Sequence, residues 1–189
     1  MNYGRSMQLP KVTAPRTGRI GLAIVAFLLA GIMLAGQADA QGARTERFFD
    51  DWTVACVEDA EGQVNCEMRQ LHVTNQPRQN VFRWLIGRAT EGRFAGQLVN
   101  VFQAPLGVSL PEGIEVDVDG LGSFAVAFEI CGSVWCQGRV AMSDDLAAQM
   151  AAGASANIHY RDGRGNSVRT EATGRGFGDA LQYLRSQGD

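Results

Sequence analysis

Four cysteines are the residues of this 189-residue sequence whose spacing most restricts its chemistry. Cys56 and Cys66 lie ten positions apart, and Cys131 and Cys136 lie five apart around the tetrapeptide Gly-Ser-Val-Trp. Such pairs are typical of zinc half-sites, redox-active dithiols or disulfides. Zinc knuckles have about two to four intervening residues, a range that the second pair reaches and the first exceeds. A thioredoxin-type pair has about two intervening residues at a helix N-terminus, which neither pair offers.

Two histidines are the candidates for a general base, and a base needs a nucleophile within reach. His72 and His159 both lie in strand-like segments beside apolar residues, where an isolated histidine is more often structural than catalytic. Residues 153–157 begin like a nucleophile elbow but lack its last glycine, and residues 174–178 lack the spacing of a dinucleotide-binding loop. The sequence therefore predicts no catalytic residue. A small periplasmic hydrolase that uses His159 or His72 with a carboxylate is the alternative hypothesis.

An alternating acidic stripe, Glu115, Asp117 and Asp119, resembles the first half of a calcium-binding loop. The complete loop needs a bidentate carboxylate about six residues after its glycine, but Val126 occupies that position after Gly120. A strand explains the same pattern, because its acidic residues would face water while the alternating aliphatic residues face a core. We therefore predict no metal site and no cofactor, and any weak divalent binding to the stripe would be incidental.

The N-terminus determines which cysteine chemistry to expect, because it indicates export. Basic residues precede an uncharged apolar run from residue 20 to residue 34, and the sequence Ala-Asp-Ala ends at Ala40. This order is typical of a secretory signal peptide, residues 1–40, that is cleaved after Ala40. An uncleaved membrane anchor is the alternative, since the run approaches the length of a spanning helix. We predict cleavage and a periplasmic or secreted protein that begins at Gln41.

The predicted mature chain, residues 41–189, is acidic and long enough for one domain. Its 13 arginines and 19 acidic residues, with no lysine, give a formal charge of −6. A solvated acidic surface disfavours binding to nucleic acid and to anionic lipid. A chain of about 150 residues is expected to form one domain with one core.

Export to an oxidising compartment favours disulfides over metal or dithiol chemistry at the four cysteines. Four cysteines allow three connectivities. If a hairpin centres near Glu61, Cys56 faces Cys66, and the alternating apolar residues before Cys131 and after Cys136 predict a second hairpin. We therefore predict two local disulfides, each worth about 2 to 3 kcal/mol in the chain-entropy model and acting mainly on strand register.

Most of the predicted mature chain is expected to form short strands separated by turns. Many short strands at regular spacing favour an all-β fold, an antiparallel sandwich or barrel-like single domain. Two short helices are expected, one between Ser143 and Gly153 and one near Asp179 to Arg185. A lead-in at residues 42–50 is expected to precede strands near residues 51–57, 63–73, 80–88, 94–103, 113–119, 123–131, 136–142, 155–161 and 166–172.

Six segments follow one another in a recognisable order: residues 52–56, 66–70, 105–120, 128–140, 143–153 and 176–181. This ordered set resembles the invasion-associated locus B family, from about Phe49 to Leu184. One departure is the cysteine tip, where the family leads us to expect a glycine immediately before Cys136 and this sequence has Trp135. The resemblance implies an exported bacterial envelope or periplasmic protein and supplies no catalytic residue.

Trp135, at the tip between the last two cysteines, is the candidate partner-binding residue. A ring closed by a disulfide loses little conformational entropy on binding, so a side chain displayed there would be preorganised. The alternative is that the indole folds back on the sheet and contributes apolar burial. We predict a non-enzymatic exported protein that acts through its surface, in envelope maintenance or in host-cell contact or invasion. Its expected partner is another protein or an envelope component.

Overall fold

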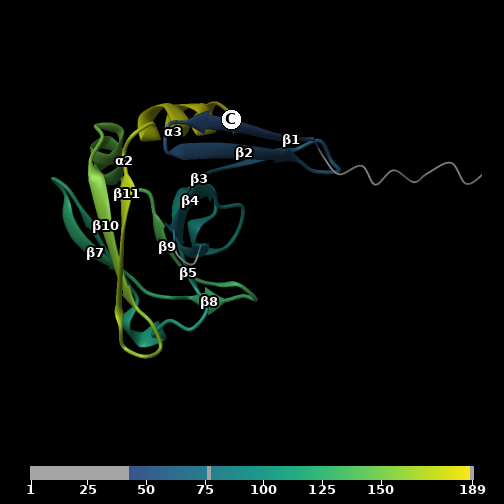
Figure 1. Ribbon diagram of the computed structural model, residues 1–189. Coiled ribbons are helices and arrows are strands. Elements are labelled where there is room, and N and C mark those ends of the chain that lie inside the picture. Colours follow the sequence, from purple (N-terminus) through teal and green to yellow (C-terminus); the bar gives the residue numbers. More distant parts are fainter. Residues whose placement is uncertain (1–42, 76–77, 188–189) are drawn as a thin grey trace, which may run out of the picture. The chain divides into compact units, whose positions relative to one another are not determined.

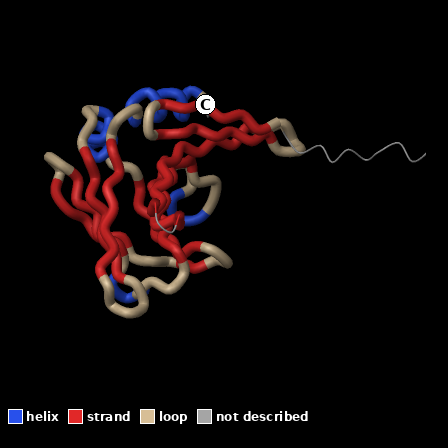
Figure 2. Tube along the Cα trace, in the orientation of Figure 1, coloured by secondary structure: helices blue, strands red, loops and turns tan. Residues whose placement is uncertain are grey.

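The computed structural model describes residues 43–75 and 78–187, which form two antiparallel sheets and two short helices (Figures 1 and 2). Side chains from both sheets and both helices share one hydrophobic core. The all-β prediction with short helices and two local disulfides is confirmed. The predicted signal peptide and its cleavage site after Ala40 lie outside the described residues.

The larger sheet consists of five strands that are consecutive in the chain and two later strands that extend it. Its order is β1-β2-β3-β4-β5-β9-β8, and every neighbouring pair is antiparallel. Asp59 closes the β2–β3 turn, because its carboxylate accepts the backbone N–H groups of Glu61 and Gln63. The strands are β1 (Arg44–Phe49), β2 (Trp52–Glu58), β3 (Val64–Asn75), β4 (Arg78–Arg88), β5 (Leu98–Pro105), β8 (Ile130–Cys131) and β9 (Trp135–Ala141).

The smaller sheet pairs a hairpin from the middle of the chain with a hairpin near its end, in the order β11-β10-β6-β7. Ile114, Val116 and Val118 are buried while Glu115 is exposed, so the predicted alternation of this segment is confirmed. Tyr160 joins the two sheets, because its hydroxyl donates to the carbonyl of Val81 at 2.5 Å. The strands are β6 (Ile114–Val118), β7 (Gly122–Val126), β10 (Ser155–Arg161) and β11 (Ser167–Thr173).

Aromatic rings fill the centre of the core. Trp52 packs edge-on against Trp84 and Phe177, with ring centroids 5.5 and 5.0 Å away. Each buried indole has a hydrogen-bond acceptor: Trp52 donates to the carbonyl of Thr173 at 2.8 Å, and Trp84 donates to the side chain of Asn100 at 3.0 Å. Because these buried N–H groups are paired, both indoles stabilise the core without the cost of an unsatisfied donor.

Two helices, α2 (Asp144–Ala151) and α3 (Phe177–Ser186), complete the domain. Ser143 caps α2 as predicted, because its hydroxyl accepts the backbone N–H of Leu146 at 3.2 Å. Gly176 precedes α3 with a φ of 78°, and a Cβ there would overlap the carbonyl oxygen of Phe49. This close approach seats α3 against the β1–β2 turn. Neither helix of the described residues has the length and hydropathy to cross a membrane.

The β1–β2 turn is also tied to the end of β11 by polar contacts. Arg175 donates two hydrogen bonds to Asp51, at 2.6 and 3.0 Å, and the Thr173 hydroxyl donates a third at 2.6 Å. These bonds, that of Arg175 first, lower the pKa of Asp51 below its ordinary value. The Gln70 amide accepts the backbone N–H of Thr173 at 3.0 Å. The contacts fix the end of the smaller sheet to the first hairpin.

The structure corrects three of the predicted segments. The lead-in at 42–50 contains strand β1, whose side chains are exposed except that of Phe49, so no alternation of burial marks it. The strand at 123–131 is two strands, β7 and β8, in different sheets. The chain leaves the smaller sheet where the carbonyl of Ala127 closely approaches Gly138, in a space that a Cβ would fill. The strand at 94–103 begins only at Leu98, because Gly92–Phe94 forms a 3₁₀ turn.

Candidate partner-binding site

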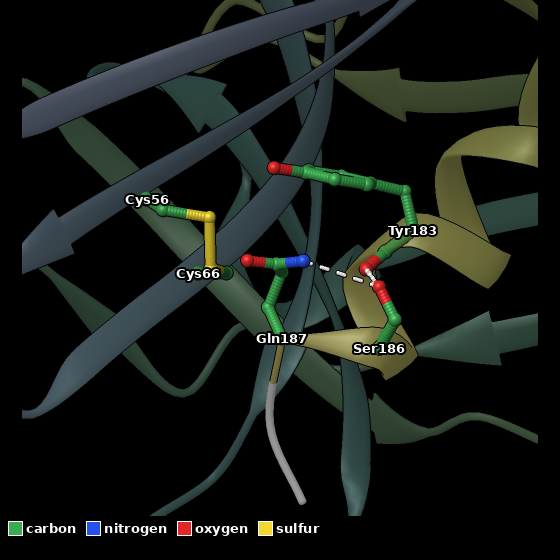
Figure 3. Close-up of a disulfide and its surroundings, with 5 residues drawn as sticks. All are labelled: Cys56, Cys66, Tyr183, Ser186 and Gln187. Atoms are coloured by element: carbon green, nitrogen blue, oxygen red, sulfur yellow. Dashed lines mark hydrogen bonds between the residues drawn. A yellow bond between two sulfur atoms is a disulfide. The ribbon is translucent and has the colours of Figure 1, made fainter.

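Both predicted disulfides are present, and each joins directly opposed residues of neighbouring antiparallel strands. Cys56 and Cys66 connect β2 to β3, and Cys131 and Cys136 connect β8 to β9, with S–S distances of 2.04 Å. Figure 3 shows the first bond beside Gln187, which follows α3. Each of the four sulfur atoms belongs to one of these two bonds, so the prediction of two local disulfides is confirmed.

Trp135 is half-buried and begins β9 at the Cys131–Cys136 tip. Its carbonyl accepts the backbone N–H of Gly132 at 2.8 Å, which closes the turn between the two cysteines. Cys136 is buried, so Trp135 lies on the opposite side of β9, on the face of the larger sheet directed away from the core. We call this face the outer face. The indole is therefore partly exposed to solvent, and its role in partner binding stays a prediction.

A guanidinium group covers the Trp135 ring and is held there by two glutamines. The Cζ atom of Arg83 lies 5.5 Å from the ring centroid, within the range of a cation–π contact. Arg83 Nε donates to Gln103 at 2.8 Å, and Gln103 in turn donates to Gln137 at 2.8 Å. Burial lowers the pKa of Arg83, although an arginine stays charged at any physiological pH.

The sequence analysis missed Arg83, Gln103 and Gln137. They occupy the outward positions of β4, β5 and β9, and the register pairs Arg83 with Gln103 and Gln103 with Gln137. Polar residues at alternate positions of predicted strands were the available signal. Placing them side by side also requires the register of three strands, because the hydrogen-bonded partners are 20 and 34 residues apart in the chain.

Exposed aliphatic side chains surround this site. Val134, which is 59% exposed, lies in the segment that the Cys131–Cys136 disulfide closes, and Ile130, which is 61% exposed, immediately precedes it. Leu71 on β3, which pairs with Arg83, is 49% exposed. Apolar groups clustered on a rigid surface are typical of contact sites for other molecules, whereas single exposed ones are ordinary. We therefore treat the tip and the adjoining outer face as the candidate partner-binding site.

The two histidines lie in different sheets. His159 is on β10, paired with Glu115 on one side and Arg169 on the other. His72 is on β3, where burial lowers its pKa and its Nε2 atom has no hydrogen-bond partner. Among the hydrogen bonds of the described residues, none joins either histidine to a serine or threonine hydroxyl. His159 shares a surface pocket with Glu115 and Ser167, but no described hydrogen bond links the three, so the hydrolase alternative stays a hypothesis.

The acidic stripe lies on the outward side of the smaller sheet. Glu115 is exposed, Asp117 accepts a hydrogen bond from the Ser123 hydroxyl at 3.1 Å, and Asp119 follows the end of β6. Within residues 43–75 and 78–187, no three histidine, cysteine, aspartate or glutamate side chains are grouped to hold a metal ion. The strand explanation of Glu115 and Asp117 is confirmed.

The fold and the site define a protein of two antiparallel sheets with two disulfides, one of which closes a tip on the surface. The family model "Invasion associated locus B (IalB) protein" matches residues 52–185, and the chain belongs to this family. The crystal structure of invasion associated protein B from Bartonella henselae is similar, with a TM-score of 0.61 and 16% sequence identity over 75% of this chain and 96% of that chain. At that identity the similarity concerns the fold. No curated protein matches the chain.

Proposed function

We propose that this IalB-family protein is an exported, non-enzymatic protein of the periplasm or cell envelope that acts by binding a partner at the Cys131–Cys136 tip. The partner is another protein or an envelope component, and the setting is envelope maintenance or host-cell contact or invasion. The family name and the signal-peptide pattern of residues 1–40 support export and an envelope setting.

One observation carries the binding role: the half-buried indole of Trp135 lies on a disulfide-closed tip beside the exposed Ile130 and Val134. Tryptophan is enriched among the residues that dominate binding energy, and such residues are surrounded by contacts that exclude water. The disulfide limits the loss of conformational entropy when the tip is ordered against a partner. An aromatic anchor with an apolar rim on a rigid turn therefore suits recognition.

Capture of partners from the native envelope tests the role. The substitution Trp135→Ala should reduce capture by about tenfold or more. Because Trp135 is half-buried, the same change should also lower the free energy of unfolding, by about 1 to 3 kcal/mol, which is less than a fully buried indole would cost.

A second pair of variants separates binding from stability. Val134→Ser alters the tip, and Val64→Ser alters an exposed valine, 47% accessible, within the Cys56–Cys66 hairpin. Only Val134→Ser should weaken capture, while both should leave the melting temperature within about 2 °C of the wild type. Equal capture by both variants, together with unchanged capture by Trp135→Ala, would remove the tip from consideration.

Export and the absence of activity need their own measurements. Intact mass and cell fractionation should find a soluble protein that begins at Gln41, whereas a full-length chain in the membrane fraction would overturn the proposed cleavage. A screen with esterase, amidase and glycosidase substrates should find no turnover. Reproducible turnover that disappears in His72→Ala or His159→Ala would establish the hydrolase instead.

A further inference from the structure

Arg83 differs from Arg69 and Arg139, which also lie on the outer face, because it has no carboxylate partner among the described residues. Arg69 contacts Glu46 at 2.7 Å and Glu67 at 3.1 Å, and Arg139 contacts Glu129 at 2.7 Å. Among the ion pairs of the described residues, none includes Arg83. Glu67 attracts the Arg83 charge only at longer range, without an ion pair, so this half-buried guanidinium still gains from direct contact with an external anion.

The contacts of Arg83 hold it in place without neutralising it. Its Nε donates to the neutral amide of Gln103, at 2.8 Å, and its Cζ atom lies over the Trp135 ring. In the described hydrogen bonds the two terminal nitrogens have no acceptor, so their four N–H groups are available to an external acceptor. Two oxygens of one carboxylate match two such donors in a bidentate arrangement.

The neighbours of Arg83 form one row across five strands of the outer face. Register pairs place Leu71, Arg83, Gln103, Gln137 and Ile130 side by side on β3, β4, β5, β9 and β8. The guanidinium lies against Gln103, on the middle strand of the five, and an exposed aliphatic side chain lies at each end. Strands are about 4.8 Å apart, so the row spans about 19 Å, the length of about six extended residues.

We propose that this row binds a short, extended, acidic segment of another protein, with one carboxylate on Arg83 and apolar side chains on Leu71 and Ile130. The inference rests on the proposed function, since it names the partner of the same site. A polypeptide fits better than a phosphate or sugar headgroup, because both ends of the row are aliphatic and exclude water instead of donating hydrogen bonds. The length of the row places the apolar residues of the partner two to three positions on either side of its acidic residue.

A defined peptide tests the proposal. The probe is a fluorescein-labelled peptide with one central glutamate and a leucine three positions away on each side, separated by serine and glycine. Fluorescence anisotropy with the oxidised exported protein, residues 41–189, should show saturable binding that weakens with added salt. The matched peptide with glutamine in place of glutamate should bind about tenfold more weakly, because a neutral amide cannot accept charge-assisted hydrogen bonds.

Variants of the protein separate Arg83 from the other basic residues. Arg83→Lys keeps the positive charge but removes the planar guanidinium group, and it should lower the affinity for the glutamate peptide by about tenfold. Arg139→Lys is the matched control, because Glu129 already pairs with that arginine, and it should change affinity by less than about twofold. Gln103→Glu would supply an internal carboxylate to Arg83 while the Gln137 amide rotates to donate, and it should abolish binding.

Each alternative outcome has a defined meaning. Equal affinity for the glutamate and glutamine peptides, no binding at millimolar peptide, or an unchanged affinity in both Arg83→Lys and Gln103→Glu overturns the proposal. Stronger competition by inorganic phosphate or by vesicles that contain anionic lipid also overturns it, in favour of a headgroup ligand. If Trp135→Ala loses envelope capture while Arg83→Lys retains it, the tip binds but this partner class is wrong. If neither variant loses capture, the proposed function fails as well.

Discussion

Gly176 offers the sharpest test of how the last helix is fixed to the first hairpin. Its φ of 78° is a conformation that residues with a Cβ rarely adopt. A Cβ at this position would overlap the carbonyl oxygen of Phe49 and lie 3.0 Å from the Cβ of Asp50. The substitution Gly176→Ala should therefore cost free energy in two ways, through backbone strain and through displacement of the β1–β2 turn.

The two costs can be separated with a second glycine. A left-handed conformation costs a residue with a Cβ about 1 to 2 kcal/mol, and forced repacking costs about 1 to 3 kcal/mol. Gly165 has a φ of 84° but nothing within 4 Å of an added Cβ. Gly165→Ala should therefore cost only the first amount, and Gly176→Ala about 2 to 5 kcal/mol. The difference between the variants measures the contact with the turn.

Thermal and urea unfolding of the oxidised variants measures these costs. A domain of this size loses about 2 to 4 °C of melting temperature per kcal/mol, so Gly176→Ala should melt clearly below Gly165→Ala. Near-ultraviolet circular dichroism should also change only in Gly176→Ala, because α3 carries Phe177 against the ring of Trp52. Equal losses of stability in the two variants, with unchanged spectra, would refute the close packing of Gly176 on the turn.

Three further perturbations probe the Cys131–Cys136 disulfide and the ionisable contacts between the sheets. Replacing Cys131 and Cys136 together by serine should lower the free energy of unfolding, measured by denaturant titration, by about 2 to 3 kcal/mol. An unchanged free energy of unfolding would mean that the bond does not restrict the unfolded chain. Hydrogen bonds from Arg175 depress the folded pKa of Asp51, so this contact stabilises the protein above the ordinary aspartate pKa and is lost as pH falls through the lower folded value. Asp51→Asn should therefore approach wild-type stability in acid, and a gap that stays constant with pH would contradict this. Burial raises the pKa of Tyr160 to about 12, so stability should fall as pH rises from about 10 to about 12, and a Tyr160→Phe variant should lack that fall.

Local signals made the first disulfide hairpin and α2 predictable from the sequence. The turn at Asp59 and the ten-residue separation place Cys56 opposite Cys66 without reference to the rest of the fold. Ser143, followed by acidic residues, is sufficient to begin α2. In each case the residues that determine the structure are neighbours in the chain, so their pattern can be read in isolation.

Long-range structure was not accessible in the same way. The alternation of apolar residues continues from Phe124 through Val126 to Phe128, because all three contact the core, although the chain changes sheets after Val126. Periodicity reports burial and not which sheet a residue joins. The strand β1 was missed for the opposite reason, since its exposed side chains carry no pattern although its backbone is paired with β2. The site around Arg83 depends on both kinds of information.

The order of the strands has a consequence for how the chain folds while it is being synthesised from its N-terminus onward. Each of the strands β1 to β4 pairs with the next strand in the chain, so the meander from β1 to β5 can form early, from local contacts. The smaller sheet cannot follow, because β6 is flanked by β7 and by β10, which comes 37 residues after β6 ends. Phe177, which covers Trp52, belongs to the last element of all. A nascent chain therefore exposes one side of the meander until its final residues arrive, and this is the period in which a chaperone has the most apolar surface to protect.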